Sequence, residues 1–480
     1  MGISQSNEEK SKSQRFDYIN HNTGNIFNYY DLVKHIGIGR CGAVYHAKDI
    51  KTNLPRAIKE FRISKMKNED IKNFECEVKI IKSMDHPNIM KIYEVIESPY
   101  AYYLVCEYLE GRNLMEEILR GHKFNEKDIA RYMEDILYAI SYCNQEKYMH
   151  NDIRPDNMVF EGPGVNGKLK LIDFGQACGE DENDERTKKY GQIHFRAPET
   201  FVKVPSEAQL FDLRAKKDVW SAGVIFYILL TKKPLVAGSK DKDIKKFHKA
   251  YNPSSLDELG IDQLALNLLK AMLEKDPTMR VSAQEALNFP FLKKHRHPDK
   301  AAITETIAKM QTFISTSALD TKMMSLVAVH LLTVEEEKSR SSVFKSLDLK
   351  FDGYLDQEEL EEASNQFGFP LENARTIAIN SDLDASGKIS YTEYLTCSLN
   401  WKQFLNVEKI DTVLGHFDVF RKGALTENEL KKLLKGVSEA EWNNFFEEVD
   451  QNNDRLISTT ELQKYFLKIA EKFATVTQSQ

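Results

Sequence analysis

Four acidic segments of twelve residues recur in the last third of the chain. They begin at Asp348, Asp382, Asp418 and Asp450, so successive segments start 34, 36 and 32 residues apart. Apolar residues at helical spacing flank them, as in "VFKSL" before the first and "ELQKYF" after the last. A repeat of this length is one supersecondary unit that buries its apolar face against a neighbour. The repeat therefore predicts four helix–loop–helix units arranged as two pairs.

The second segment has the full ligand pattern of a calcium-binding EF-hand loop. Such a loop needs oxygen donors at positions 1, 3, 5, 9 and 12, a backbone carbonyl at position 7 and glycine at position 6. Gly387 stands at the sixth position, where the chain turns sharply. The predicted calcium ligands are Asp382, Asp384, Ser386, Lys388 through its carbonyl, Ser390 and Glu393.

The other three segments depart from this pattern. In the fourth, Arg455 replaces the glycine, and a positive φ there costs on the order of 1 kcal/mol, which predicts weaker binding. In the first, Lys350 brings a positive charge to a ligand position and disfavours a cation. The third has Phe420 and Lys422 at ligand positions, which predicts a structural unit without metal. The ligand sets are Asp450, Asn452, Asp454, Leu456 through its carbonyl, Ser458 and Glu461 in the fourth loop, and Asp348, Asp352, Tyr354 through its carbonyl, Asp356 and Glu359 in the first.

A glycine-rich turn near the start of the chain predicts a phosphate-binding loop. The run "HIGIGRCGAVYHAKD" supplies Gly37, Gly39 and Gly42, with Val44 two residues further on. Glycines allow backbone N–H groups to approach a phosphate closely. A dinucleotide-binding turn of this kind opens into a helix, whereas "AVYHAKD" has the composition of a strand. The turn is therefore predicted to join two strands.

A lysine and a glutamate downstream form a predicted ion pair. "RAIK" places Lys59 at the end of an apolar strand, and the helical run "NEDIKNFECEVKIIKSMD" follows. Helical spacing puts Glu77 beside the apolar face of that helix, where a lone carboxylate is costly. Lys59 is the expected counter-charge, and the pair would direct the ammonium at nucleotide phosphates. Glu75 lies further round the helix and is the weaker candidate.

Two further motifs complete an ordered set. "YMHNDIRPDNMVF" carries Asp152 as the candidate base for a substrate hydroxyl and Asn157 as a candidate metal ligand, and "LKLIDFG" carries Asp173 at the end of a strand. "APE" follows at residues 197–199. Each motif alone has a structural explanation, but their order along the chain is specific. Residues 30–292 therefore resemble the protein kinases.

The resemblance implies roles for particular residues. Mg²⁺ would bind to Asn157 and Asp173, Arg154 would stand near the reacting phosphate, and Arg280 would pair with Glu199. Cys106 would be a small gatekeeper, and adenine would contact the backbone of Glu107 and Leu109. The catalytic residues implied are Asp152, Lys59, Arg154, Asn157 and Asp173, and the ATP-binding residues are Gly37, Gly39, Gly42, Val44, Ala57, Lys59, Glu77, Cys106, Glu107, Leu109 and Val159.

Four positions differ from the usual kinase pattern. Asn151 replaces an arginine that grips activation-loop phosphate in many kinases, and Arg154 replaces a lysine. Gln192 stands in place of a threonine, and Asn113 in place of a carboxylate that contacts ribose or substrate. None of the four removes a metal ligand, the lysine or the base, so activity is favoured. A calcium-responsive scaffold with a weakly active or inactive kinase fold stays open as the alternative.

Nearly the whole chain after residue 30 resembles the calcium-dependent protein kinases of plants and protists. The predicted fold is multidomain, an α+β bilobal kinase followed by an all-α, calmodulin-like module of four EF-hands. Family membership implies a serine/threonine kinase that the connector and module inhibit until calcium binds. The predicted boundaries are a flexible segment at 1–29, the kinase at 30–292 with lobes 30–108 and 109–292, a connector at 293–340, and EF-hand pairs at 341–400 and 401–475.

The connector carries an apolar stripe that suits an EF-hand groove. Ile303, Ile307, Met310 and Phe313 recur at helical spacing. The alternative is an interdomain helix that only packs. Either arrangement predicts a contact between the kinase and the module within one chain, with ATP, Mg²⁺ and Ca²⁺ as cofactors and protein substrates as partners.

Composition and the N-terminus bear on location. A net charge of −7 gives no reason to expect nucleic acid, and six scattered cysteines are typical of a reduced, cytoplasmic protein. "MGISQS" fits the pattern for N-myristoylation at Gly2, although a chance match in a polar leader is the alternative. One acyl chain holds a membrane only reversibly. The expectation is a cytoplasmic monomer with reversible membrane association.

Overall fold

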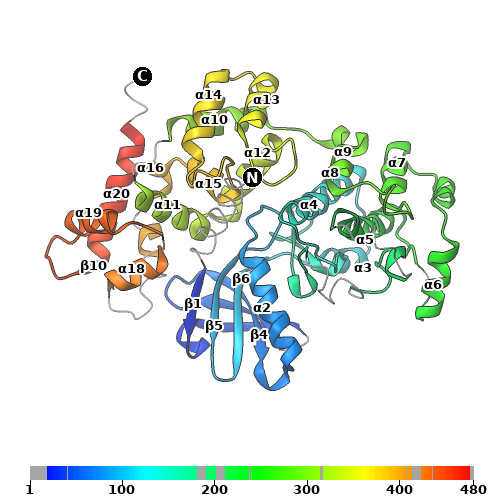
Figure 1. The fold of residues 1–480 in the computed structure, drawn as a ribbon, viewed down its shortest axis with the longest axis horizontal. Coiled ribbons are helices and arrows are strands. Elements are labelled where there is room, and N and C mark those ends of the chain that lie inside the picture. The colour runs from blue at the N-terminus through cyan, green and yellow to red at the C-terminus, as the bar shows by residue number, and fades with distance from the viewer. Residues whose placement is uncertain are drawn as a thin grey trace.

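The structure is a computed structural model, and Figure 1 shows its fold. In Figure 1 a small lobe (blue) meets a larger lobe (cyan to green), and a helical module (yellow to red) lies beside them. This arrangement confirms the predicted fold class. The described residues are 19–39, 42–180, 191–201, 211–236, 238, 240–313, 317–406, 408–412, 423–434 and 436–475. Gly2, Phe420 and Lys422 lie outside these ranges, so the structure does not test the predictions made for them.

The small lobe is a six-stranded sheet with one long helix. The order of the strands is β1-β5-β6-β4-β3-β2, and β1 pairs with β5 in parallel while the other pairs are antiparallel. Alternating buried and exposed residues in β4 are typical of a strand covered on one face. The elements are β1 Asn20–Thr23, β2 Tyr30–Ile38, β3 Ala43–Asp49, β4 Pro55–Arg62, α2 Asn68–Lys82, β5 Ile92–Glu97 and β6 Ala101–Glu107, with short 3₁₀ turns at Ile26–Asn28 and Ile63–Lys65.

The first strand corrects one predicted boundary. The sequence places residues 1–29 in a flexible segment, and for residues 20–28 that prediction is wrong. β1 adds to the edge of β5, and the following turn buries Ile26 against Tyr30 and Val105. The signal is absent from the sequence because a four-residue edge strand and one isoleucine produce no period.

The large lobe is built around α4 (Glu126–Gln145), which packs against α5, α8 and α9. An Asn125 capping box begins α4, and thirteen of its twenty residues are buried, so this helix is the core of the lobe. The other elements are α3 Leu114–Leu119, β7 Met158–Phe160, β8 Leu169–Leu171, α5 Phe211–Thr231, α6 Asp241–Ala250, α7 Gln263–Met272, α8 Ala283–Leu287 and α9 Pro290–His295, with 3₁₀ turns at Pro155–Asn157, Phe174–Gln176, Pro198–Phe201 and Pro253–Leu259.

The connector lies inside the helical module. The helix α10 (Lys300–Thr312) packs against α12, α13, α14 and α15, and α11 (Ala318–Leu331) packs against α15 and α19. The module consists of α12 Val334–Leu347, α13 Gln357–Phe367, α14 Leu371–Ser381, α15 Tyr391–Cys397, α16 Trp401–Phe404, β9 Ala424–Thr426, α18 Glu427–Leu433, α19 Glu439–Val449, β10 Leu456–Ser458 and α20 Thr459–Thr475. None of the helices within the described ranges is both long and apolar enough to span a membrane.

The predicted stripe and the predicted pairing of the hands are both present. Ile303, Ile307, Met310 and Phe313 are all buried, at 3% exposure or less. The first two loops pair through a bridge between Leu355 and Ile389, and the last two pair through β9 and β10. Each bridge joins the eighth positions of two loops, which is how EF-hands share their apolar faces.

Candidate active site and calcium loops

Lys59 joins two carboxylates from different lobes. Its Nζ lies 2.6 Å from Glu77 Oε1 on α2 and 2.8 Å from Asp173 Oδ1 beyond β8. Burial lowers the pKa of Lys59, but the two carboxylates raise it more, so the ammonium stays charged. Lys59 in turn lowers the pKa of Asp173. The predicted pair with Glu77 is therefore present, and the exposed Glu75 takes no part in it.

The glycine turn joins β2 to β3, as the composition of "AVYHAKD" predicts. The Gly39 amide donates to the Gly42 carbonyl at 2.9 Å and closes the turn. A Cβ atom at Gly42 would lie 2.0 Å from the carbonyl oxygen of Glu60 in β4. Gly42 is thus required for close packing against the sheet, in addition to the phosphate approach expected from the sequence.

The candidate base Asp152 is held from two directions. The Asn157 amide donates to the Asp152 Oδ2 at 3.0 Å and to the Asp152 carbonyl at 2.9 Å, and the Gln192 backbone amide donates to Oδ1 at 3.2 Å. The Asn157 amide nitrogen is committed to Asp152, so its oxygen is the atom that would contact a cation. Gln192 acts through its backbone, which explains why the loss of the usual threonine leaves the contact intact.

Asn151 fixes the catalytic loop to its surroundings. It has φ of 62°, a left-handed conformation that asparagine tolerates better than most residues. Its side-chain amide donates to the carbonyl of Gln176 at 3.2 Å and to Cys178 Sγ at 3.0 Å. The backbone amides of His150 and Asn151 donate to the carboxylate of Asp218 at 2.7 and 2.9 Å. The segment after Asp173 is therefore tied to the catalytic loop by direct contacts.

Two other departures from the kinase pattern have local explanations. Arg154 Nε lies 3.0 Å from Asp156 Oδ2, so its charge is partly neutralised within the loop. The Asn113 side chain accepts from the Glu116 amide at 2.8 Å and caps α3. The spacing of asparagine three residues before glutamate is an N-cap signal that the sequence interpretation missed.

The structure also describes the residue expected beside the hinge and the ion pair expected in the large lobe. Cys106 is buried, and burial raises the pKa of its thiol to about 12, which keeps the thiol neutral and fits the expected gatekeeper position. Arg280 binds Glu199 with both terminal nitrogens, at 2.7 and 2.9 Å, beneath Trp220. The remaining expected nucleotide-site residues are half-buried, namely Val44, Ala57, Leu109 and Val159.

Three loops share one EF-hand backbone. The fourth and sixth positions have positive φ in each, at Phe351 and Gly353, Ala385 and Gly387, and Asn453 and Arg455. In the second loop, Asp382, Asp384 and Glu393 have ligand oxygens within 4.8 Å of one another. Burial and nearby carboxylates raise the pKa of Glu393 to about 8. The loop therefore has the carboxylate crowding that a divalent cation relieves.

The fourth loop has the strained residue predicted for it. Arg455 has φ of 62°, and its amide donates to Asp450 Oδ2 at 2.9 Å. The Glu461 carboxylate accepts from the Gln451 amide at 3.0 Å, as Glu393 does from Leu383 at 2.9 Å. The backbone contacts of the twelfth-position glutamate are thus the same in both loops, while the strain at Arg455 and the closer carboxylates of the second loop distinguish them.

The first loop lies against the kinase. Asp348 accepts from the Tyr138 hydroxyl on α4, and the Ser141 hydroxyl donates to the Phe351 carbonyl at 2.6 Å. Lys350 contacts Asp356 and lies 2.9 Å from Glu358, away from the converging oxygens of Asp348, Asp352 and Glu359. Lys350 thus pairs with Asp356 and removes it as a calcium ligand. The sequence predicts a different effect, a direct repulsion between the lysine and the cation. Lys388 Nζ donates to the Asp352 carboxylate at 2.6 Å.

Comparisons with known proteins agree with this geometry. The chain matches the protein kinase domain over residues 30–292 and the EF-hand domain pair over residues 336–397. It is 32% identical over 473 residues to calcium-dependent protein kinase 4 of Plasmodium falciparum (isolate 3D7), covering 93% of this chain and 88% of that protein. The chain belongs to the calcium-dependent protein kinase family. Calcium-dependent protein kinase 3 of Plasmodium berghei (strain Anka) is 30% identical over 460 residues, covering 92% of this chain and 81% of that protein.

This calcium-dependent protein kinase uses ATP and Mg²⁺ in its kinase domain and Ca²⁺ in its EF-hands. Mg²⁺ supplies charge neutralisation at the transferring phosphate, and the oxygens of Asn157 and Asp173 fit that role. Asp152 is placed where it would accept the proton of the substrate hydroxyl, and Lys59 where it would position the phosphates. The alternative of an inactive scaffold is not supported, because these groups are assembled and the chain matches the protein kinase domain and relatives named calcium-dependent protein kinases.

Proposed function

We propose that this kinase transfers the ATP γ-phosphate to serine or threonine in protein substrates. The observation that carries the proposal is the joined set of Lys59, Glu77 and Asp173, with Asp152 held at hydrogen-bond distance by Asn157. The "RPDN" run supports serine and threonine over tyrosine. Transfer of radiolabelled phosphate to a general protein substrate, in calcium or chelator, tests it. Transfer that Asp152→Ala leaves unchanged would refute the assigned base.

The proposal extends to regulation by the module. Calcium would bind most tightly at the second loop and more weakly at the fourth, where Arg455 is strained. The connector stripe of Ile303, Ile307, Met310 and Phe313 is covered by the module. Without calcium, the connector and module would inhibit the kinase, and calcium would favour the covered arrangement. Equal activity in calcium and chelator would contradict this part.

The proposal for location rests on the sequence alone. Myristoylation of Gly2 would give a cytoplasmic, monomeric kinase a weak and reversible hold on membranes. Incorporation of labelled myristate that Gly2→Ala abolishes would support it. A single peak at the monomer mass in analytical ultracentrifugation, at micromolar concentration, would support the monomer.

A further inference from the structure

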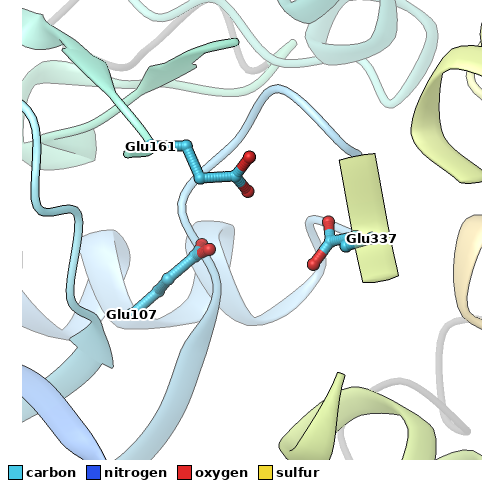
Figure 2. A group of neighbouring side chains, drawn as sticks. All are labelled: Glu107, Glu161 and Glu337. Carbon is cyan, nitrogen blue, oxygen red and sulfur yellow. The ribbon is translucent and has the colours of Figure 1, made fainter. Parts of the chain in front are cut away.

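Three glutamates, two of them buried and Glu107 half-buried, converge where the kinase meets the module. Figure 2 shows the carboxylates of Glu107, Glu161 and Glu337 pointing towards one another. Glu107 ends β6 at the hinge, Glu161 follows β7, and Glu337 lies on α12 of the module. Their oxygens lie within 4.8 Å of one another, a spacing that a metal ion could also occupy. The charges around them decide between an ion and a protein contact.

Three lysines occupy this cluster and make it an ion-pair network. Glu337 contacts the ammonium groups of all three, and Lys170 also contacts the other two glutamates. The Nζ to Oε distances are 2.8 Å for Lys91–Glu337, 3.0 Å for Lys168–Glu337, 3.8 Å for Lys170–Glu337, 3.1 Å for Lys168–Glu161, 3.2 Å for Lys170–Glu161 and 2.6 Å for Lys170–Glu107.

The module supplies the charge that balances this network. The kinase contributes Lys91, Lys168 and Lys170 against two glutamates, which leaves one positive charge in excess. Lys170 is fully buried and Glu337 is 4% exposed with α12 in place, so water is excluded and the excess charge has to be balanced by a carboxylate there. The three lysines hold the pKa of Glu337 well below its usual range against the effect of burial. Glu337 is therefore the residue that neutralises the kinase surface on docking.

The network reaches the nucleotide site through Glu107. Its carboxylate accepts from Lys170 Nζ at 2.6 Å and from the Lys91 backbone amide at 3.2 Å. Glu107 is the hinge position whose backbone is expected to contact adenine. Any shift of Lys170 or Lys91 when Glu337 leaves would move the side chain that orients this hinge residue.

The same network reaches the second calcium loop. The Tyr391 hydroxyl donates to Glu337 Oε1 at 3.0 Å. The Thr392 backbone amide and hydroxyl donate to the Asp85 carboxylate at 2.9 and 3.0 Å. Tyr391 and Thr392 are the two residues between the predicted calcium ligands Ser390 and Glu393. An ion that fixes both ligands also fixes Thr392, which binds the kinase directly, and Tyr391, which positions Glu337 against the kinase lysines.

We propose that Tyr391, Glu337 and Thr392 couple calcium at the second loop to the nucleotide hinge. Tyr391 acts through Glu337 and Lys170 on Glu107, and Thr392 anchors the same segment on Asp85. This inference rests on the calcium regulation proposed above. The docked arrangement coexists with the assembled Lys59, Glu77 and Asp173 set, so docking favours the active kinase. Calcium acts by favouring the loop conformation in which both contacts form, which is the differential binding that a switch requires.

The test uses the full-length chain and a general protein substrate such as casein. Phosphate transfer is measured against ATP and free calcium, and calcium binding by isothermal titration calorimetry. Glu337→Gln removes one charge from the network, so the KM for ATP rises and the calcium-stimulated kcat/KM falls by about fivefold or more. The calcium stoichiometry does not change. Glu335→Gln, an exposed acid on the same helix, is the matched control and behaves as wild type.

A second variant guards against a folding defect at the buried Glu337. Asp85 is half-buried, and Asp85→Ala removes both Thr392 contacts. The calcium concentration for half-maximal activity then rises by about threefold or more. A folded Glu337→Gln enzyme with wild-type KM and kcat/KM overturns the proposal. If Glu337→Gln does not fold, an unchanged calcium midpoint in Asp85→Ala overturns it. A wild-type enzyme that calcium does not stimulate would instead refute the proposed regulation itself.

Discussion

The ammonium of Lys59 lies 2.6 Å from Glu77, and the same nitrogen lies 2.8 Å from Asp173 in the other lobe. Removal of the Glu77 charge by Glu77→Gln leaves Lys59 with one carboxylate partner. Loss of one charge-assisted hydrogen bond of about 1.5–3 kcal/mol predicts a fall in kcat/KM of at least about tenfold. Steady-state kinetics check this, with the exposed Glu75→Gln on the same helix as control. Equal losses in both variants would contradict the assignment.

The base at Asp152 makes a separate prediction. Asp152→Ala removes proton acceptance from the substrate hydroxyl, so kcat falls by about 10²–10⁴-fold. ATP binding is retained, because Asp152 touches neither Lys59 nor the hinge in the described structure. Nucleotide binding by calorimetry alongside kcat separates the two effects. Loss of ATP binding in this variant would indicate a structural role instead.

The strain at Arg455 predicts a gain of affinity. Arg455→Gly relieves a positive φ worth on the order of 1 kcal/mol, so the weaker calcium site tightens by about fivefold. Arg455→Gln removes the charge but keeps the Cβ atom. The difference in calcium affinity between the two variants therefore gives the backbone contribution. Calcium titration calorimetry of the three proteins measures both. If Arg455→Gln gains as much as Arg455→Gly, the effect is electrostatic.

Lys350 predicts a change in stoichiometry. Lys350→Asp frees Asp356 and supplies an oxygen at the third position, so the first loop gains a calcium site and binding rises by about one ion per chain. Mass spectrometry under native conditions counts the ions. Lys402→Asp, a reversal at an exposed lysine outside the loops, adds none. An unchanged count would mean that Tyr138 and Lys388 hold the loop too firmly for an ion.

His248 predicts a pH dependence of stability. Burial among Phe201, Trp220 and Phe247 lowers the pKa of His248 to about 4. The fold holds the ring neutral, whereas the unfolded chain protonates it near pH 6.5. Its stabilising contribution is complete above about pH 6.5 and is lost as the pH falls towards 4.

His248→Phe therefore loses less stability between pH 7 and 4.5 than the wild type does. After allowance for solvent screening, the difference is about 1–2 kcal/mol in the free energy of unfolding. Urea unfolding at the two pH values measures it, with the exposed His297→Phe as control. A variant that loses as much stability as wild type would show that other groups dominate the acid response.

The chemistry and the order of the domains could be predicted from the amino-acid pattern alone. The second calcium loop is contiguous, so twelve residues specify its ligands. The Lys59–Glu77 pair could be predicted because helical spacing put one carboxylate beside an apolar face. Local backbone geometry fixes the direction of side chains within one strand, turn or helix. Helices and strands repeat with a fixed number of residues, so these directions follow from the sequence.

The contact between the module and the kinase could not be predicted, because it forms between surfaces far apart along the chain. Tyr138 and Asp348 are 210 positions apart, and Lys168 and Glu337 are 169 positions apart. No spacing rule relates such residues, because their contact depends on how two folded surfaces fit. The same holds for β1, whose four residues become a strand only at the edge that β5 offers. The sequence therefore predicts phosphate transfer and calcium binding. The packing of α12 and the second loop on the kinase shows how the two sites are connected.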